Sequence, residues 1–170
     1  MKKLIIFILC IFSICLFSSC NIRDDVVRIH IRANSNLAMD QEVKLKVRDK
    51  IIYTITPLIA ECENSSDVKN VLSTNIQTIQ SVADDVLRQN GFEYRSKASL
   101  NNEYFPSREY DGEVFCAGYY DALILNLGSG TGDNWWCVAY PPLCFVGNDG
   151  SGSVKYESKL IELVKKFFGE

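Results

Sequence analysis

The segment from residue 128 to residue 145, GSGTGDNWWCVAYPPLCF, constrains the fold of this chain more than any other part of it. It contains both tryptophans, an adjacent proline pair and three glycines at alternate positions. The glycines predict a turn in which the backbone adopts positive φ or approaches another segment closely. Trp135 and Trp136 are adjacent, so on a strand their rings point to opposite faces of the sheet. Pro141 and Pro142 then stiffen the chain and favour an extended residue before them.

The same segment predicts a binding surface. Because adjacent tryptophans cannot both be buried on one side of a strand, we expect one ring in the core and the other at an interface. An aromatic ring beside a rigid proline loop provides a large contact area for a small loss of entropy. The candidate partner-binding residues of this segment are Asn134, Trp135, Trp136, Tyr140, Pro141 and Pro142.

Residues 26–33 predict a strand in which apolar and polar residues alternate. His30 and Arg32 fall on one face of it, which is either exposed or meets the region of Trp136. Both are therefore further candidates for partner binding. For Asn34 and Ser35, which follow the strand, a turn that caps backbone groups is the favoured interpretation.

The rest of the chain alternates between helical and strand patterns. Asp40 is expected to cap a helix that bends or ends near Pro57, and residues 68–87 to form a second helix that stops at Asn90 and Gly91. Strands are expected at residues 92–100, at residues 114–127 with a break at 117–118, and at residues 136–140, which would pair with 114–127 as a hairpin. Residues 101–112 read as a polar loop, and a final helix follows residue 153. The prediction is a single α+β domain with an antiparallel sheet, covered by a helix pair and a C-terminal helix.

Residues 1–22 predict export from the cytoplasm. Lys2 and Lys3 precede an uncharged run over residues 4–22, which is typical of a secretory signal and also long enough for an uncleaved membrane anchor. Cys20, directly after two serines, adds lipid modification as a third route. Residues 23–170 would then form one extracytoplasmic domain, secreted or held at a membrane.

Charge and cysteine content narrow the class of protein. The formal net charge of the chain is −3, and it becomes −5 once Lys2 and Lys3 are removed with the first 19 residues. A mildly acidic domain lacks the positive surface that nucleic acid requires, so no nucleic-acid partner is expected. The single histidine and the scattered cysteines lack metal-ligand spacing, so we expect no metal and no cofactor.

The cysteines leave two alternatives open. Cys137 and Cys144 either form a disulfide across the proline pair or stay buried as free thiols. Cys137 together with His30 would also be the pair required by an exported cysteine-dependent hydrolase, since a nucleophilic thiol needs a base. The sequence does not place the imidazole near the sulfur, and we expect no catalytic residue.

Three segments carry a resemblance to a known family. The pattern GxGxGxNWWCVxxPPLCF in residues 128–145 resembles the signature of the stage II sporulation protein R family of endospore-forming bacteria. Residues 28–35, with residues 40–49 after them, and residues 105–123 resemble the family in the same order. The resemblance covers most of the chain from residue 26 to residue 146, although Cys116 stands where the family would have proline.

The resemblance implies a signalling function. Proteins of this family are made in the forespore and exported to the space between the two membranes. There they activate a membrane-embedded aspartic protease, which then processes pro-sigma-E in the mother cell. By resemblance, the chain would be a non-enzymatic activator that works by binding this protease.

Overall fold

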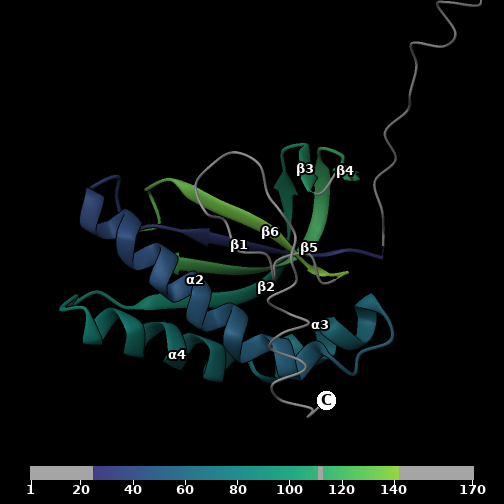
Figure 1. Ribbon diagram of the computed structural model, residues 1–170, viewed down its shortest axis with the longest axis horizontal. Coiled ribbons are helices and arrows are strands. Elements are labelled where there is room, and N and C mark those ends of the chain that lie inside the picture. The colour runs from purple at the N-terminus through teal and green to yellow at the C-terminus, as the bar shows by residue number, and fades with distance from the viewer. Residues whose placement is uncertain (1–24, 111–112, 142–170) are drawn as a thin grey trace, which may run out of the picture.

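The computed structural model describes residues 25–110 and 113–141 of the 170-residue chain. Figure 1 shows helices along one face of a sheet and a small hairpin rising from the other face. This α+β arrangement confirms the predicted fold class. In chain order the elements are β1 (Val27–Arg32), α2 (Ala38–Ile59), α3 (Ser65–Thr74), α4 (Ile76–Gln89), β2 (Ser96–Phe105), β3 (Arg108–Tyr110), β4 (Glu113–Phe115), β5 (Gly118–Leu127) and β6 (Asn134–Tyr140).

The main sheet has the strand order β2-β5-β1-β6. β1 runs parallel to β5 and antiparallel to β6, while β2 and β5 are antiparallel. The sheet is therefore mixed, and the predicted all-antiparallel sheet is wrong. The hairpin predicted between residues 114–127 and 136–140 is also wrong, because β1 lies between β5 and β6.

The alternation predicted for residues 26–33 is confirmed in β1. Val27, Ile29 and Ile31 are fully buried against the helices in the main hydrophobic core. Burying each of these side chains stabilises the fold by about 2 kcal/mol. The polar residues of β1 face the other side of the sheet, where a second and smaller apolar cluster lies beneath the β3–β4 hairpin.

The first helix departs from the prediction at its start, whereas its end near Pro57 agrees with it. Leu37, not Asp40, occupies the N-cap, and Asp40 lies in the first turn. Its buried carboxylate accepts hydrogen bonds from Ser35, Tyr94 and Asn34. Burial opposes ionisation of this carboxyl, but the three hydrogen bonds outweigh it and hold its pKa below the usual range. At the other end α2 continues through Pro57 to Ile59, because only the last turn has to accommodate the missing N–H.

The second predicted helix is two helices. α3 begins after Asn64, whose side chain accepts a hydrogen bond from the Asp67 N–H at 3.0 Å, as expected of a cap. It ends at Thr74, and the next residue, Asn75, separates α3 from α4 and donates its side-chain amide to the Val71 carbonyl at 2.8 Å. The predicted stop at Asn90 and Gly91 is confirmed, with Gly91 at φ +81°.

The segment predicted as a polar loop is mostly strand. β2 starts at Ser96, not at residue 92, and extends to Phe105, where it still pairs with Gly118 of β5. Residues 108–110 then form β3, which pairs with β4. The break expected at residues 117–118 separates β4 from β5.

The expected N-terminal export segment and the final helix lie outside the described residues. Within residues 25–110 and 113–141, none of the helices combines the length and apolar character that a membrane crossing requires.

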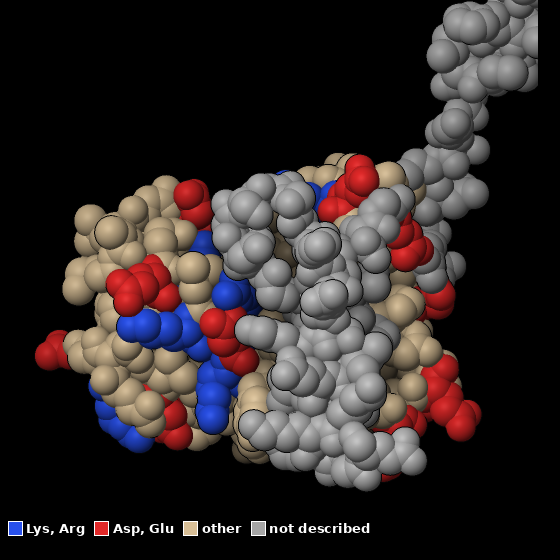
Figure 2. Space-filling view, viewed as in Figure 1, with Lys and Arg blue, Asp and Glu red and all other residues tan. Residues whose placement is uncertain are grey.

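Basic residues gather on the outer surface of α2, where Figure 2 shows a band of Lys and Arg beside acidic groups. Lys46 pairs with Glu42 at 2.8 Å, and Arg48 pairs with Asp49 at 2.7 Å. Lys50 lies 5.1 Å from the ring of Tyr53. These charges have local partners, as is usual for a solvated helix face.

The glycine-rich turn after β5 is held by the turn after β1. The Asn34 side-chain oxygen accepts the Ser129 N–H at 2.9 Å, and the Asn34 carbonyl accepts the hydroxyls of Ser129 and Thr131. Gly128 has φ +56°, and a Cβ there would overlap the Asn34 side chain. Asn34 therefore lies in a turn and binds a backbone N–H group, as the sequence predicts.

We predict that Gly128→Ala lowers the free energy of unfolding by about 2–4 kcal/mol, because it adds backbone strain and displaces Asn34 from its hydrogen bonds. Gly91→Ala is the matched control: its φ is also positive, but an added Cβ would meet nothing within 4 Å. Strain alone should cost about 1 kcal/mol there. Urea denaturation of both variants measures the difference, and equal losses would contradict the role given to Asn34.

Candidate functional site: a polar and aromatic face of the sheet

The face of the sheet opposite the helices brings together four of the predicted binding residues. The antiparallel register pairs His30 with Trp136 and Arg32 with Asn134 across β1 and β6. Since side chains alternate along both strands, all four lie on this face, which none of the helices within the described residues covers. The open question about His30 and Arg32 is thereby answered: they meet the region of Trp136.

His30 lies at the centre of the face and is 4% exposed. Its Nε2 is 2.8 Å from Asn134 Oδ1, and its ring centroid is 5.4 Å from that of Trp136. Its Nδ1 faces Glu103 Oε1 at 3.3 Å. Burial lowers the pKa of His30 to about 4, an effect that the Asn134 hydrogen bond opposes and the charge of Arg32 strengthens. The imidazole is therefore neutral at neutral pH.

Arg32 links three strands of the sheet. Its guanidinium forms an ion pair with Glu103 of β2 and donates to Asn126 Oδ1 of β5 at 2.8 Å. Glu103 is not among the residues predicted from the sequence, because residues 101–112 were predicted to form a loop. Its signal was the continued alternation of residues 97–105, which sets Glu103 and Phe105 on the same face.

Arg28 is the second missed residue, and it is fully buried. Its guanidinium lies 4.6 to 5.5 Å from four aromatic rings, within the range of cation–π attraction. Nε donates to the Cys137 carbonyl at 3.0 Å and a terminal nitrogen donates to the Tyr110 hydroxyl at 3.2 Å. The rings belong to Phe105, Tyr110, Phe115 and Tyr120.

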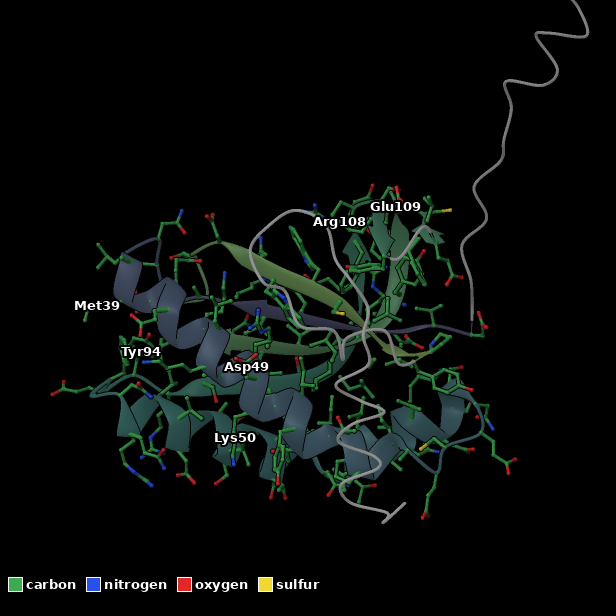
Figure 3. All side chains as sticks on the ribbon, in the orientation of Figure 1. Met39, Asp49, Lys50, Tyr94, Arg108 and Glu109 are labelled. Carbon is green, nitrogen blue, oxygen red and sulfur yellow. The ribbon has the colours of Figure 1, made fainter. Side chains whose placement is uncertain are left out.

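The β3–β4 hairpin covers one end of this face. The Tyr110 hydroxyl donates to the Trp136 carbonyl at 3.1 Å, while the exposed Arg108 places its guanidinium 4.7 Å from the Trp136 ring. Figure 3 shows Arg108 and Glu109 on this hairpin, on the far side of the sheet from Lys50 of α2. We use the name polar face below for Arg28, His30, Arg32, Glu103, Arg108, Asn134 and Trp136.

Trp135 and Tyr140 do not join the polar face. Trp135 packs against the main core on the helix side, 5.7 Å from the guanidinium of Arg48. Tyr140 packs against the same core and donates its hydroxyl to the Glu63 carbonyl at 2.8 Å. Pro141 follows it through a cis peptide bond, and Pro142 lies outside the described residues. The tryptophans do point to opposite faces, but both are half-buried, so neither is fully core.

Cys137 is a free thiol, so of the two alternatives left open for it, the buried free thiol is the one that holds. Its register partner is Ile29, so its side chain enters the helix-side core, where it is 5% exposed. Cys116, by contrast, is disulfide-bonded. Cys20 and Cys144 lie outside the described residues.

The location of Cys137 also argues against the cysteine-hydrolase alternative. His30 is on the polar face and Cys137 is on the helix side, so the sheet separates the proposed base from the proposed nucleophile. A nucleophile and its base have to lie within hydrogen-bond reach.

Among the described residues, no cluster of three or more His, Cys, Asp or Glu side chains is arranged to hold a metal ion.

Comparison with known proteins decides the family. The family model described as "Stage II sporulation protein R (spore_II_R)" matches residues 23–149. The chain belongs to the stage II sporulation protein R family. A similar relative is "Stage II sporulation protein R" of Bacillus subtilis (strain 168), 31% identical over 134 residues. The match covers 79% of this chain and 60% of that protein, so the chain spans less than two thirds of its relative's length. No solved structure matches the chain significantly.

The fold explains why two segments that resemble the stage II sporulation protein R family go together. Residues 28–35 and the start of 128–145 lie side by side: the Gly132 N–H donates to the Ala33 carbonyl at 2.9 Å, and β6 then pairs along β1. The two segments thus build one unit that presents the polar face.

His30 provides a direct test of this site, because it is the only histidine in the chain. We predict that its Hε1 resonance titrates near pH 4 in the folded protein, and near 6.5 in urea. Since the folded state binds fewer protons between these values, stability should fall by up to about 3 kcal/mol as pH drops from 6.5 to 4. His30→Gln should flatten this part of the pH dependence of unfolding. A folded-state pKa near 6.5 would contradict the burial described here.

Proposed function

We propose that this chain is an exported sporulation signal, which activates a membrane-embedded aspartic protease so that pro-sigma-E is processed in the mother cell. Membership of the stage II sporulation protein R family is the observation that carries this proposal. In this proposal the chain is made in the forespore, and residues 1–22 direct or anchor it on the outer side of the membrane.

The mechanism we propose is activation by binding. The protease is taken to exchange between an inactive and an active state. An activator shifts this equilibrium by no more than the difference between its binding free energies for the two states. A preorganised surface suits this task, because less ordering entropy is lost on association. The buried part of the polar face meets this requirement: Arg28, His30 and Arg32 are fixed by hydrogen bonds to neighbouring strands.

The separation of His30 from Cys137 supports binding over thiol chemistry as the source of activity. On this proposal the thiol has no chemical role, and the domain acts through its surface.

The test is reconstitution in a non-sporulating host that expresses this chain, its cognate protease and pro-sigma-E. We predict that cleavage of pro-sigma-E depends on the chain and continues at the wild-type rate with Cys137→Ala, which should destabilise the fold by about 1 kcal/mol. Cys62→Ala, at the other free and partly exposed cysteine, is the control. Cleavage that disappears only with Cys137→Ala, in a stably exported protein, would instead indicate thiol chemistry.

A further inference from the structure

The polar face contains an unusual concentration of unsatisfied polar atoms. In the described part of the chain, four buried side-chain nitrogen or oxygen atoms have no hydrogen-bond partner, and all four belong to the polar face. They are Arg28 Nη1, His30 Nδ1, Glu103 Oε2 and Trp136 Nε1. An unsatisfied buried polar group costs about 1–3 kcal/mol, so a partner that satisfies such groups gains affinity here.

The charges of the polar face do not cancel. Its one carboxylate, Glu103, is paired with Arg32, and His30 is neutral. Arg28 and Arg108 take part in none of the ion pairs formed within residues 25–110 and 113–141. Two guanidinium groups therefore lack a counter-charge there, in a chain whose net charge is −3.

The two arginines have different tasks. Arg28 is fixed by its aromatic cage and two hydrogen bonds, so it supplies a permanent positive potential from beneath the face. Arg108 is exposed, lies over the Trp136 ring and is free to turn toward an incoming group. Trp136 Nε1, which can only donate, needs an acceptor.

We propose that the polar face binds an acidic side chain of a partner protein. Its carboxylate pairs with Arg108 and accepts the hydrogen bond of Trp136 Nε1, in the positive potential of Arg28. A carboxylate fits because it only accepts hydrogen bonds and can serve two donors at once. This inference rests on the proposed function and specifies the chemistry of the partner: an acidic residue on the exported side of the protease.

The basic band on α2 is a weaker candidate for the same partner. Its cations already pair with Glu42 and Asp49 or lie against Tyr53, so an incoming carboxylate would have to compete with them. Arg108 contacts the ring of Trp136 but takes part in none of the ion pairs of the described residues, so an incoming carboxylate would meet no competing carboxylate there.

The experiment is a charge reversal in the reconstituted cleavage assay. Arg108→Glu should reduce pro-sigma-E cleavage at limiting chain by about tenfold or more, as expected for an interface arginine. Arg108→Lys should retain most of the activity because it keeps the charge. Arg88→Glu, on the helix side and 75% exposed, is the matched control and should leave cleavage unchanged. A cooperative urea denaturation curve like that of the wild-type chain reports that Arg108→Glu is folded.

A second arm identifies the partner group. Reversing the charge of each Asp and Glu on the exported side of the protease in turn should yield one variant that restores cleavage with Arg108→Glu. If the wild-type chain supports cleavage and Arg108→Glu is equally active, this inference alone is overturned. If the wild-type chain supports no cleavage, the proposed function is overturned as well. If Arg108→Glu lost binding to phosphatidylglycerol vesicles and no protease variant restored cleavage, the anionic group would be lipid, and the inference would be wrong.

Discussion

The alternation of β1 between apolar and cationic side chains is the constraint on which the rest of this structure depends. Because β1 is an inner strand between β5 and β6, both of its faces have to be covered. The helices cover Val27, Ile29 and Ile31 on one side. On the other side the fold has to accommodate Arg28, His30 and Arg32, and it does so with aromatic rings, one carboxylate and amide oxygens.

Arg28 shows how a charge is tolerated within this arrangement. Transferring a guanidinium from water into a protein interior is costly unless the charge is stabilised there. Here four ring faces, a backbone carbonyl and a tyrosine hydroxyl replace part of the lost hydration. Two of the rings and the hydroxyl come from the β3–β4 hairpin, so the same contacts that accommodate the charge also hold the hairpin against the sheet.

The turns at the far end of β1 fix the position of β6. Asn34 contacts the glycine-rich turn through its side chain and its carbonyl, and Asp40 in turn accepts hydrogen bonds from Asn34, Ser35 and Tyr94. The position of Trp136 is therefore coupled to a buried carboxylate in the first turn of α2. A cluster of this kind favours a single register between β1 and β6, since a shift by one residue would move every side chain of β6 to the opposite face.

Local features of the fold could be predicted from the sequence, whereas long-range features could not. The alternation of β1, the stop at Gly91 and the opposite directions of the tryptophans all depend on neighbouring residues. The pairing of β6 with β1 depends on contacts between residues about a hundred positions apart, for which the local pattern contains no signal. The burial of Arg28 could not be predicted for the same reason. In the alternating pattern of β1 it falls on the polar face, which suggests exposure, and only the distant β3–β4 hairpin covers it.

The candidate site follows the same division. His30, Arg32, Asn134 and Trp136 were found from two motifs, and the structure joins them because those motifs lie on neighbouring strands. Glu103 and Arg108 come from β2 and β3, in a region whose polar composition is typical of a loop. Composition indicates the average solvent exposure of each residue type. It cannot indicate which carboxylate or ring a distant arginine will contact.

The chain has a negative net charge, whereas its polar face is locally positive. This difference affects how an acidic partner approaches the polar face. The net charge of −3 weakly repels an acidic partner at distances comparable to the Debye length, about 8 Å at physiological ionic strength. Attraction prevails only close to Arg28 and Arg108, which take part in none of the ion pairs within the described residues. Association then depends on the orientation in which the partner approaches, and wrong orientations are disfavoured before contact. Such a distribution favours specificity over speed of association, which suits a signal that has to act on one partner.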